Sequence, residues 1–254
     1  IVETIDELDE ALGYRVGTPI IGDVHYDTPN PTPEVEAAEG PAGSVIFLDE
    51  SLEFSGERGD HLDLAHVQSL ELSEGTYATH FTVEDGDRRR TLFSKDASGY
   101  EEGGHLTAFI ERGRVKVRFQ SDSRSVWLTS ASNSIVEGQS YHLAFSFGSD
   151  GAKLYLNGDL VDQESEFTQG MALNTNSLLI GANGWSRSDS KPNDTRDQFV
   201  GVIADFTVYE SQLTDEEVDA LVNGNDSASD FVDESEDSSN QATDEFFSEM
   251  GSLF

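Results

Sequence analysis

The sequence predicts an all-β fold, an antiparallel jelly-roll β-sandwich with one short C-terminal helix and extended acidic termini. Many short runs of alternating apolar and polar residues are separated at regular intervals by Gly, Asp, Asn and Ser, which is typical of sandwiches and jelly rolls. Asn157-Gly158 stands between two such runs, and Asn-Gly is the strongest short hairpin pattern because both central residues of a type I′ turn need positive φ. The one strong helical pattern of the core, at 215–222, comes at its end.

The predicted jelly roll runs from 42 to 224. Each candidate strand is an apolar or alternating run that a turn cluster follows. These strands are 44–48, 52–54, 61–64, 67–72, 76–84, 91–95, 105–111, 114–120, 125–129, 141–147, 153–157, 159–163, 177–182 and 200–209.

The helix at 215–222 has a complete start pattern. Thr214 is the expected N-cap and Glu217 completes a capping box, while Leu213 can pack on Val218 as a hydrophobic staple. Asn223-Gly224 supplies the stop.

Acidic segments flank the predicted jelly roll on both sides. Residues 1–41 hold ten acids and one base, with a short helix expected at 5–12 and a Pro-rich linker after it. Residues 225–254 hold nine acids and no Lys or Arg. The composition of 225–245 is that of a disordered tail.

The last nine residues differ from this tail. Five apolar side chains recur at i, i+1, i+4, i+7 and i+8, the pattern of one face of a short helix that could dock on a partner. They are Phe246, Phe247, Met250, Leu253 and Phe254.

The charge of the chain limits its partners. Fifty acids against 15 bases give a net charge of −35, so we expect neither nucleic acid nor an anionic membrane surface to bind. No apolar stretch is long enough for membrane insertion. Scarce Lys with excess acid suggests a marine or halophilic source, where salt screens the charge.

The absence of Cys excludes disulfides and thiolate metal sites. The chain starts at Ile1 without a signal peptide, which suggests a processed chain or a piece of a longer one.

Several motifs resemble those of laminin-G-like, concanavalin A-like jelly-roll domains. LEFSGERGDHLDL at 52–64 resembles the opening motif of that family, and SYHLAFSF at 140–147 resembles its W/Y-H-x-A-x-x-F strand. KLYLNGDLV at 153–161 is similar to the K-L-Y-x-N-G hairpin. LLIGA at 178–182, followed by GVIADFTVYESQLTDEEVDAL at 201–221, is similar to the family's ending.

The resemblance implies a mostly non-catalytic module that binds glycans or proteins outside the cell, often with a structural calcium ion. We therefore expect a secreted, extracellular or cell-surface location. Within the resemblance, Asp205 takes the position of the aspartate in G-x-I-D, and Asp60 or Glu57 from the early loop could complete a Ca²⁺ site. The alternative is that Asp205 only hydrogen-bonds a loop at a strand end.

A basic stripe is the first candidate for ligand binding. Nine of the 15 bases lie between Arg88 and Arg124. Arg114, Lys116 and Arg118 alternate along one predicted strand and share one sheet face, with Arg112 in the turn before them. Such a stripe would hold an acidic polysaccharide, because Arg binds carboxylate and sulfate groups in bidentate geometry. The alternative is that these bases pair with neighbouring carboxylates.

A sugar site usually needs an aromatic plate as well. Trp185 lies in a loop just after a strand, which favours a place at the rim of a ligand site, although a packing role is the alternative. Trp127 lies between Val126 and Leu128 and is interpreted as a core residue.

No motif of the chain carries a reaction. The six His lack the spacing of zinc sites, and His142 is interpreted as a satisfied core residue at the family's strand position. Neither a nucleophile elbow nor paired carboxylates on one strand occur.

The sequence thus predicts a non-catalytic extracellular binding or adhesion module for an acidic polysaccharide. A structural subunit of a surface assembly, joined through its termini, is the alternative hypothesis. A polysaccharide lyase or hydrolase is the third.

Overall fold

The structure, a computed structural model, describes residues 24–25, 41–96, 103–121, 124–187, 191 and 194–223, and confirms the predicted antiparallel sandwich. One sheet has seven strands in the order β1-β3-β12-β5-β6-β7-β8. They are β1 (Val24–His25), β3 (Leu62–Leu64), β12 (Leu178–Ile180), β5 (Arg90–Lys95), β6 (His105–Ile110), β7 (Val115–Gln120) and β8 (Ser125–Thr129). The other sheet has six, in the order β11-β10-β9-β4-β13-β2. They are β11 (Asp159–Glu164), β10 (Gly151–Leu156), β9 (Ser140–Gly148), β4 (Gly75–Val83), β13 (Val200–Tyr209) and β2 (Ser44–Ser55).

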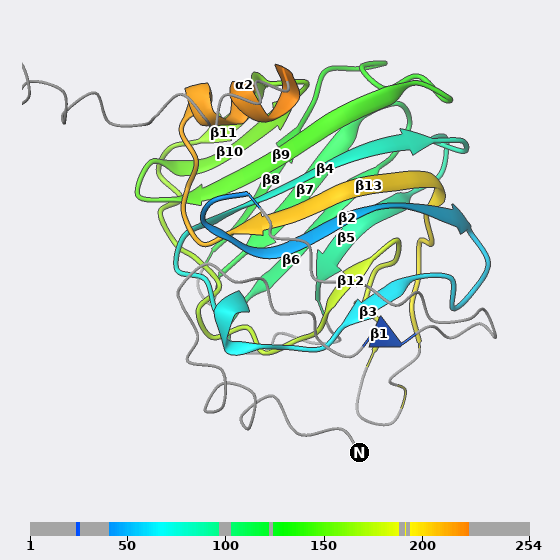
Figure 1. The fold of residues 1–254 in the computed structure, drawn as a ribbon, viewed down its shortest axis with the longest axis horizontal. Coiled ribbons are helices and arrows are strands. Elements are labelled where there is room, and N and C mark those ends of the chain that lie inside the picture. Colours follow the sequence, from blue (N-terminus) through cyan, green and yellow to red (C-terminus); the bar gives the residue numbers. More distant parts are fainter. Residues whose placement is uncertain are drawn as a thin grey trace, which may run out of the picture. The chain divides into compact units, whose positions relative to one another are not determined.

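The two sheets lie face to face, with the six-stranded sheet in front in Figure 1, and a single apolar core fills the space between them. Aromatic side chains join the layers. The ring of Phe119 on β7 lies 5.2 Å from that of Phe145 on β9, and Tyr77 on β4 stacks on Phe93 on β5 at 5.4 Å. Burial of such rings is the main stabilising term of the sandwich.

The predicted hairpin and helix are confirmed in detail. Asn157 and Gly158 have φ values of 54° and 87°, as a type I′ turn between β10 and β11 requires. Helix α2 (Asp215–Asn223) begins with the predicted capping box, because the Thr214 N–H donates to Glu217 and the Glu217 N–H donates back to the Thr214 hydroxyl at 3.2 Å.

Three local predictions were wrong. The segment 67–72 is not a strand, because Gln68–Leu70 form a 3₁₀ turn that buries only Leu70. The two strands expected at 44–48 and 52–54 are one continuous strand, β2, since β13 pairs with both parts of it, on either side of a register shift. The linker expected before residue 41 contains β1, which pairs with β3.

Other predictions lie outside the described residues. These are the helix at 5–12 and the apolar segment at 246–254. Within the described part of the chain, no helix is both long enough and apolar enough to cross a membrane.

The outer faces of the two sheets differ. Part of the outer face of the six-stranded sheet is covered by α2, whose Val218 packs with Ala78, Ala144, Tyr155 and Tyr209. The outer face of the seven-stranded sheet carries a row of aromatic and charged side chains.

Candidate functional site

The candidate site is the outer face of β6, β7 and β8. Antiparallel register places Thr107, Arg118 and Trp127 in one row across the three strands. Phe109 and Lys116 stand in the next row. Because side chains alternate between sheet faces, these residues point outward, while Val117 and Phe119 enter the core.

Trp127 is the most exposed aromatic side chain of this face, at 52%. Its ring meets that of Phe109 edge to face, with 6.2 Å between centroids. The guanidinium of Arg89 lies 4.4 Å from the centre of the Phe109 ring. The interpretation of Trp127 as a core residue was therefore wrong, since its neighbours Val126 and Leu128 point inward and the strand alternation turns Trp127 out.

Arg118 lies beside the second tryptophan. Its guanidinium carbon is 5.0 Å from the centre of the Trp185 ring, a cation–π distance. It also donates to the side-chain oxygen of Gln120 at 2.6 Å. Residues Phe109, Lys116, Arg118, Trp127 and Trp185 are called the aromatic–basic face below.

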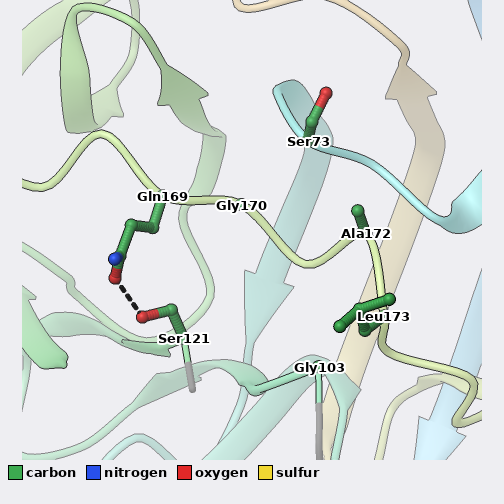
Figure 2. Close-up of a pocket in the computed structure, with 7 residues that line it drawn as sticks. All are labelled: Ser73, Gly103, Ser121, Gln169, Gly170, Ala172 and Leu173. Carbon is green, nitrogen blue, oxygen red and sulfur yellow. Dashed lines mark hydrogen bonds between the residues drawn. The ribbon is translucent and has the colours of Figure 1, made fainter. Parts of the chain in front are cut away.

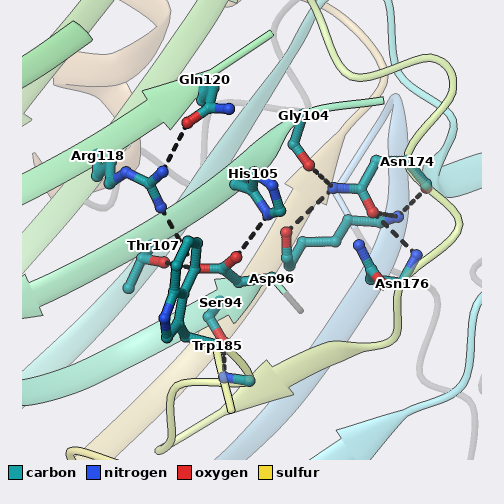
Figure 3. Close-up of polar contacts among 12 residues, drawn as sticks. Ser94, Asp96, Gly104, His105, Thr107, Arg118, Gln120, Asn174, Asn176 and Trp185 are labelled. Atoms are coloured by element: carbon teal, nitrogen blue, oxygen red, sulfur yellow. Dashed lines mark hydrogen bonds and ion pairs between the residues drawn. The ribbon is translucent and has the colours of Figure 1, made fainter. Parts of the chain in front are cut away.

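A buried carboxylate supports this face from beneath (Figure 3). Asp96 pairs with Nδ1 of His105 at 2.6 Å and accepts a hydrogen bond from the Thr107 hydroxyl at 2.9 Å. The oxygen that accepts from Thr107 also lies 3.8 Å from Arg118. The His105 ring in turn packs against Trp185, with 5.7 Å between centroids. Asp96 thus holds three outward residues of two strands in place.

The loop that carries Trp185 is tied to the sheet. The Trp185 N–H donates to the side chain of Asn183 at 2.8 Å, and the Gly184 N–H donates to the Ser94 hydroxyl at 3.1 Å. Asn183 also forms a β-bridge with Arg196. The tryptophan is therefore held in a fixed position, which lowers the entropy lost when a ligand stacks on it.

Lys116 pairs with a neighbouring carboxylate. Its ammonium group donates to Glu111 at 2.6 Å, and Arg89 contacts the other oxygen of Glu111 at 3.2 Å. The hydrogen bond from Lys116 is the main reason why the pKa of Glu111 is lowered. Lys116 and Arg89 thus share the carboxylate of Glu111. Arg118 is the base that lies between Trp127 and Trp185.

The structure separates the other two predicted bases from this group. Arg114 lies just before β7 and donates to the Ser132 hydroxyl. Arg112 is exposed in the turn between β6 and β7, with a φ of 55°. Of the predicted ligand residues, the structure brings together Lys116, Arg118 and Trp185.

A second buried polar pair stands next to Asp96. Lys95 is fully buried, and its ammonium group donates to the side-chain and main-chain oxygens of Asn174. The Asn174 amide donates back to the main-chain oxygens of Lys95 and Gly104. Burial lowers the pKa of Lys95 to about 7.

The two predicted calcium ligands have different neighbours. Asp60 accepts hydrogen bonds from the N–H and hydroxyl of Ser55, at 2.5 and 2.6 Å. Asp205 lies 3.3 Å from Nδ1 of His80. In the described ranges no three His, Asp or Glu side chains could hold a metal ion together, whereas calcium takes six to eight oxygens. Calcium, with Asp205 and Asp60 as its ligands, therefore stays a prediction of the resemblance.

A hollow of about 280 Å³ lies near the end of β7 (Figure 2). Ser121 and Gln169 hydrogen-bond at its edge, and Leu173 is 60% exposed. Gly103, Gly170 and Ala172 also line it. The described residues of this lining include no charged or aromatic side chain, so the aromatic–basic face offers the richer chemistry.

The sequence interpretation missed several residues of the site. Trp127 could have been found, because strict alternation in SVWLT turns it away from Val126 and Leu128. Asp96 and His105 had no such pattern, because their pairing joins two strands across a loop.

The family of the chain is shown by its sequence. Residues 55–219, more than half of the chain, match the model of the concanavalin A-like lectin/glucanases superfamily. The chain belongs to this superfamily, as its motifs predict. No curated protein sequence matches it significantly.

Solved structures with the same fold include carbohydrate-binding domains. The CBM40 domain of the Ruminococcus gnavus IT-sialidase, bound to α2,3-sialyllactose, is 18% identical, with a TM-score of 0.57 over 71% of this chain and 99% of that one. Domain 4 of the extracellular arabinanase AbnA from Geobacillus stearothermophilus, in complex with arabinotriose, is 18% identical, with a TM-score of 0.51 over 70% and 80%. A SAP-like pentraxin from Limulus polyphemus is 16% identical, with a TM-score of 0.53 over 69% and 82%. At these identities the likeness establishes the fold.

Proposed function

We propose that this chain is a non-catalytic carbohydrate-binding module that holds an acidic polysaccharide on its aromatic–basic face. The observation that carries the proposal is the placement of Arg118 in the same row as exposed Trp127 and against Trp185. Aromatic rings cover the C–H face of a sugar, and a guanidinium fork binds its carboxylate. The solved structures of CBM40 and of the arabinanase domain hold oligosaccharides on this fold, which supports the proposal.

The charges around Arg118 limit how strongly an acidic ligand is held. Glu111 already pairs with Lys116 and Arg89, and Asp96 lies 3.8 Å from Arg118. We therefore expect the aromatic rings to supply most of the affinity and Arg118 to supply the preference for acidic sugars. In this proposal the module works outside the cell, where polysaccharides of this kind occur.

Affinity electrophoresis in gels that contain an acidic polysaccharide, such as alginate or a sulfated galactan, tests the proposal. We expect retardation of the wild type, at least about tenfold weaker binding for W127A, and a loss of salt sensitivity for R118S. R58S is the matched control, because the Arg58 side chain is 71% exposed and pairs with Asp194, and neither residue belongs to the aromatic–basic face.

Equal retardation of W127A, W185A, R118S and the wild type would contradict the proposal. Release of new reducing ends from the same polysaccharides by the purified chain would show a hydrolase or lyase instead. The assembly hypothesis depends on residues 246–254 and is tested by comparing the mass of the full chain with that of a chain ending at residue 245.

A further inference from the structure

The outer face of the six-stranded sheet has a cavity that α2 leaves open. The helix covers Ala78 on β4 and Ala144 on β9. His80, two residues after Ala78, and His142, two residues before Ala144, are partners in the register of the two strands. Here a cavity of about 300 Å³ opens. Its lining includes Ser51, His80, Thr82, Ser140, Val202 and Asp205.

A β-bulge places Asp205 in this lining. Ile203 faces the core, so strict alternation would send residue 205 to the core as well. Instead Phe206 and Val208 are the next core residues, and the register with both neighbouring strands shifts at Asp205. Its φ of 51° is left-handed, which is uncommon for a residue other than glycine. Bulges that turn a side chain outward are frequent next to functional sites.

Hydrogen bonds hold the bulge on both sides. The Thr79 hydroxyl donates to the main-chain oxygen of Ala204 at 2.8 Å, and the Thr207 hydroxyl donates to that of Asp205 at 3.2 Å. The carboxylate of Asp205 is 51% exposed and pairs with His80, which is 38% exposed. Both groups are therefore fixed in place and open to a ligand.

His142 lies next to His80 of this pair. Its ring lies 4.8 Å from that of His80, and its Nδ1 has no hydrogen-bond partner in the described structure. Burial, and then the neighbouring His80, lower the pKa of His142 to about 4, so its ring is neutral at pH 7. His142 is buried, as the sequence predicts, but it lies on the outer face of the sheet and one of its ring nitrogens has no partner in the described structure.

We propose that this cavity binds a neutral, hydroxyl-rich ligand, a single sugar ring, through Asp205 and His80. The hydroxyls of Ser51, Thr82 and Ser140 both donate and accept hydrogen bonds, as sugar hydroxyls do. Among the residues described around the cavity there is no Lys or Arg, so from these residues a negatively charged ligand that faces Asp205 would receive no compensating cation.

This site would be independent of the aromatic–basic face, because it lies on the other sheet. The chain would then hold two different saccharides, an acidic one on the seven-stranded sheet and a neutral one here. Failure of the proposed function leaves this inference standing, and the reverse also holds.

The test follows the NMR chemical shifts of the His imidazole rings in the whole chain while glucose, galactose, mannose or arabinose is added. We expect at least one sugar, at millimolar concentration, to move the His80 resonance, which the H80Q variant identifies. D205N should weaken this binding about tenfold or more, because it removes a charged hydrogen-bond acceptor. Asn accepts the left-handed conformation as well as Asp does, so D205N keeps the bulge.

W127A is the matched control and should bind these sugars as the wild type does. If D205N does not fold, T82V, which removes one hydroxyl from the wall, replaces it and should also weaken binding. The inference is overturned if no sugar moves the His80 resonance, if D205N and T82V bind like the wild type, or if W127A alone abolishes the effect. Zinc-induced shifts of both His80 and His142 without any sugar effect would also overturn it.

Discussion

Lys95 should make the stability of this protein depend on pH between 7 and 10. Burial lowers its pKa from 10.5 to about 7 in the folded chain, while the unfolded chain keeps the ordinary value. Between these two values the unfolded state binds more protons than the folded state, so the free energy of unfolding rises with pH. Below pH 7 both states are protonated, and the full cost of burying the charge remains.

The size of the effect follows from the shift. Each pH unit in this window is worth roughly 1.4 kcal/mol. Because the Lys95 ammonium is already half deprotonated at pH 7 in the folded chain, it should add about 2 kcal/mol of stability between pH 7 and pH 9. Few other groups with a shifted pKa titrate between pH 7 and pH 9 in the folded chain. The pKa of His142 is lowered to about 4, and that of Tyr209 is raised to about 12.

K95M isolates this contribution. Met has a similar length and no charge, and the side-chain oxygen of Asn174 keeps a partner in the Asn176 N–H at 2.9 Å. The lost bond to the main-chain oxygen of Asn174 should cost about 1–3 kcal/mol at every pH. Only the pH dependence of the difference between wild type and K95M therefore reports the titration.

Urea unfolding at pH 6, 7, 8 and 9 measures how the difference in stability between the wild type and K95M depends on pH. We expect the stability of the wild type relative to K95M to rise by about 3 kcal/mol across this range. K191M, which removes an exposed lysine, should follow the wild type at every pH. Parallel curves for the wild type and K95M would refute the reasoning, because they would show that Asn174 fully compensates the buried charge.

Three further predictions concern stability. F119A should lower the free energy of unfolding by about 3–5 kcal/mol in urea, because Phe119 contacts Phe145 and two other core rings; a loss below about 1 kcal/mol would contradict the packing. T214A should cost about 1 kcal/mol through the lost N-cap, and an unchanged melting temperature would show that α2 needs no cap. D60N should cost about 1–2 kcal/mol equally in calcium and in chelator, because Asp60 binds Ser55. The family resemblance instead predicts a melting temperature that calcium raises and a D60N effect that vanishes in chelator.

Strands, hairpin and helix of this protein could be predicted from the sequence because they depend on local rules. Alternation with a period of two identified β7, β8 and β9 within one or two residues. The positive φ that Asn157-Gly158 adopts and the capping box of Thr214 are properties of neighbouring residues. The same local rules placed Lys116 and Arg118 on one face.

Only the tertiary structure decided which distant residues meet. Arg118 and Trp185 are far apart in the sequence, and their contact depends on the order of β12, β5, β6 and β7 in the sheet. Asp205 was expected within the strand at 200–209, and only the structure shows that a bulge in β13 turns it toward His80. Strand order and bulges are set by packing across the whole sheet, for which a short segment of sequence holds no information. The sequence by itself therefore determined the strands, the hairpin and the helix, and the packing of the two sheets determined which residues form the two candidate sites.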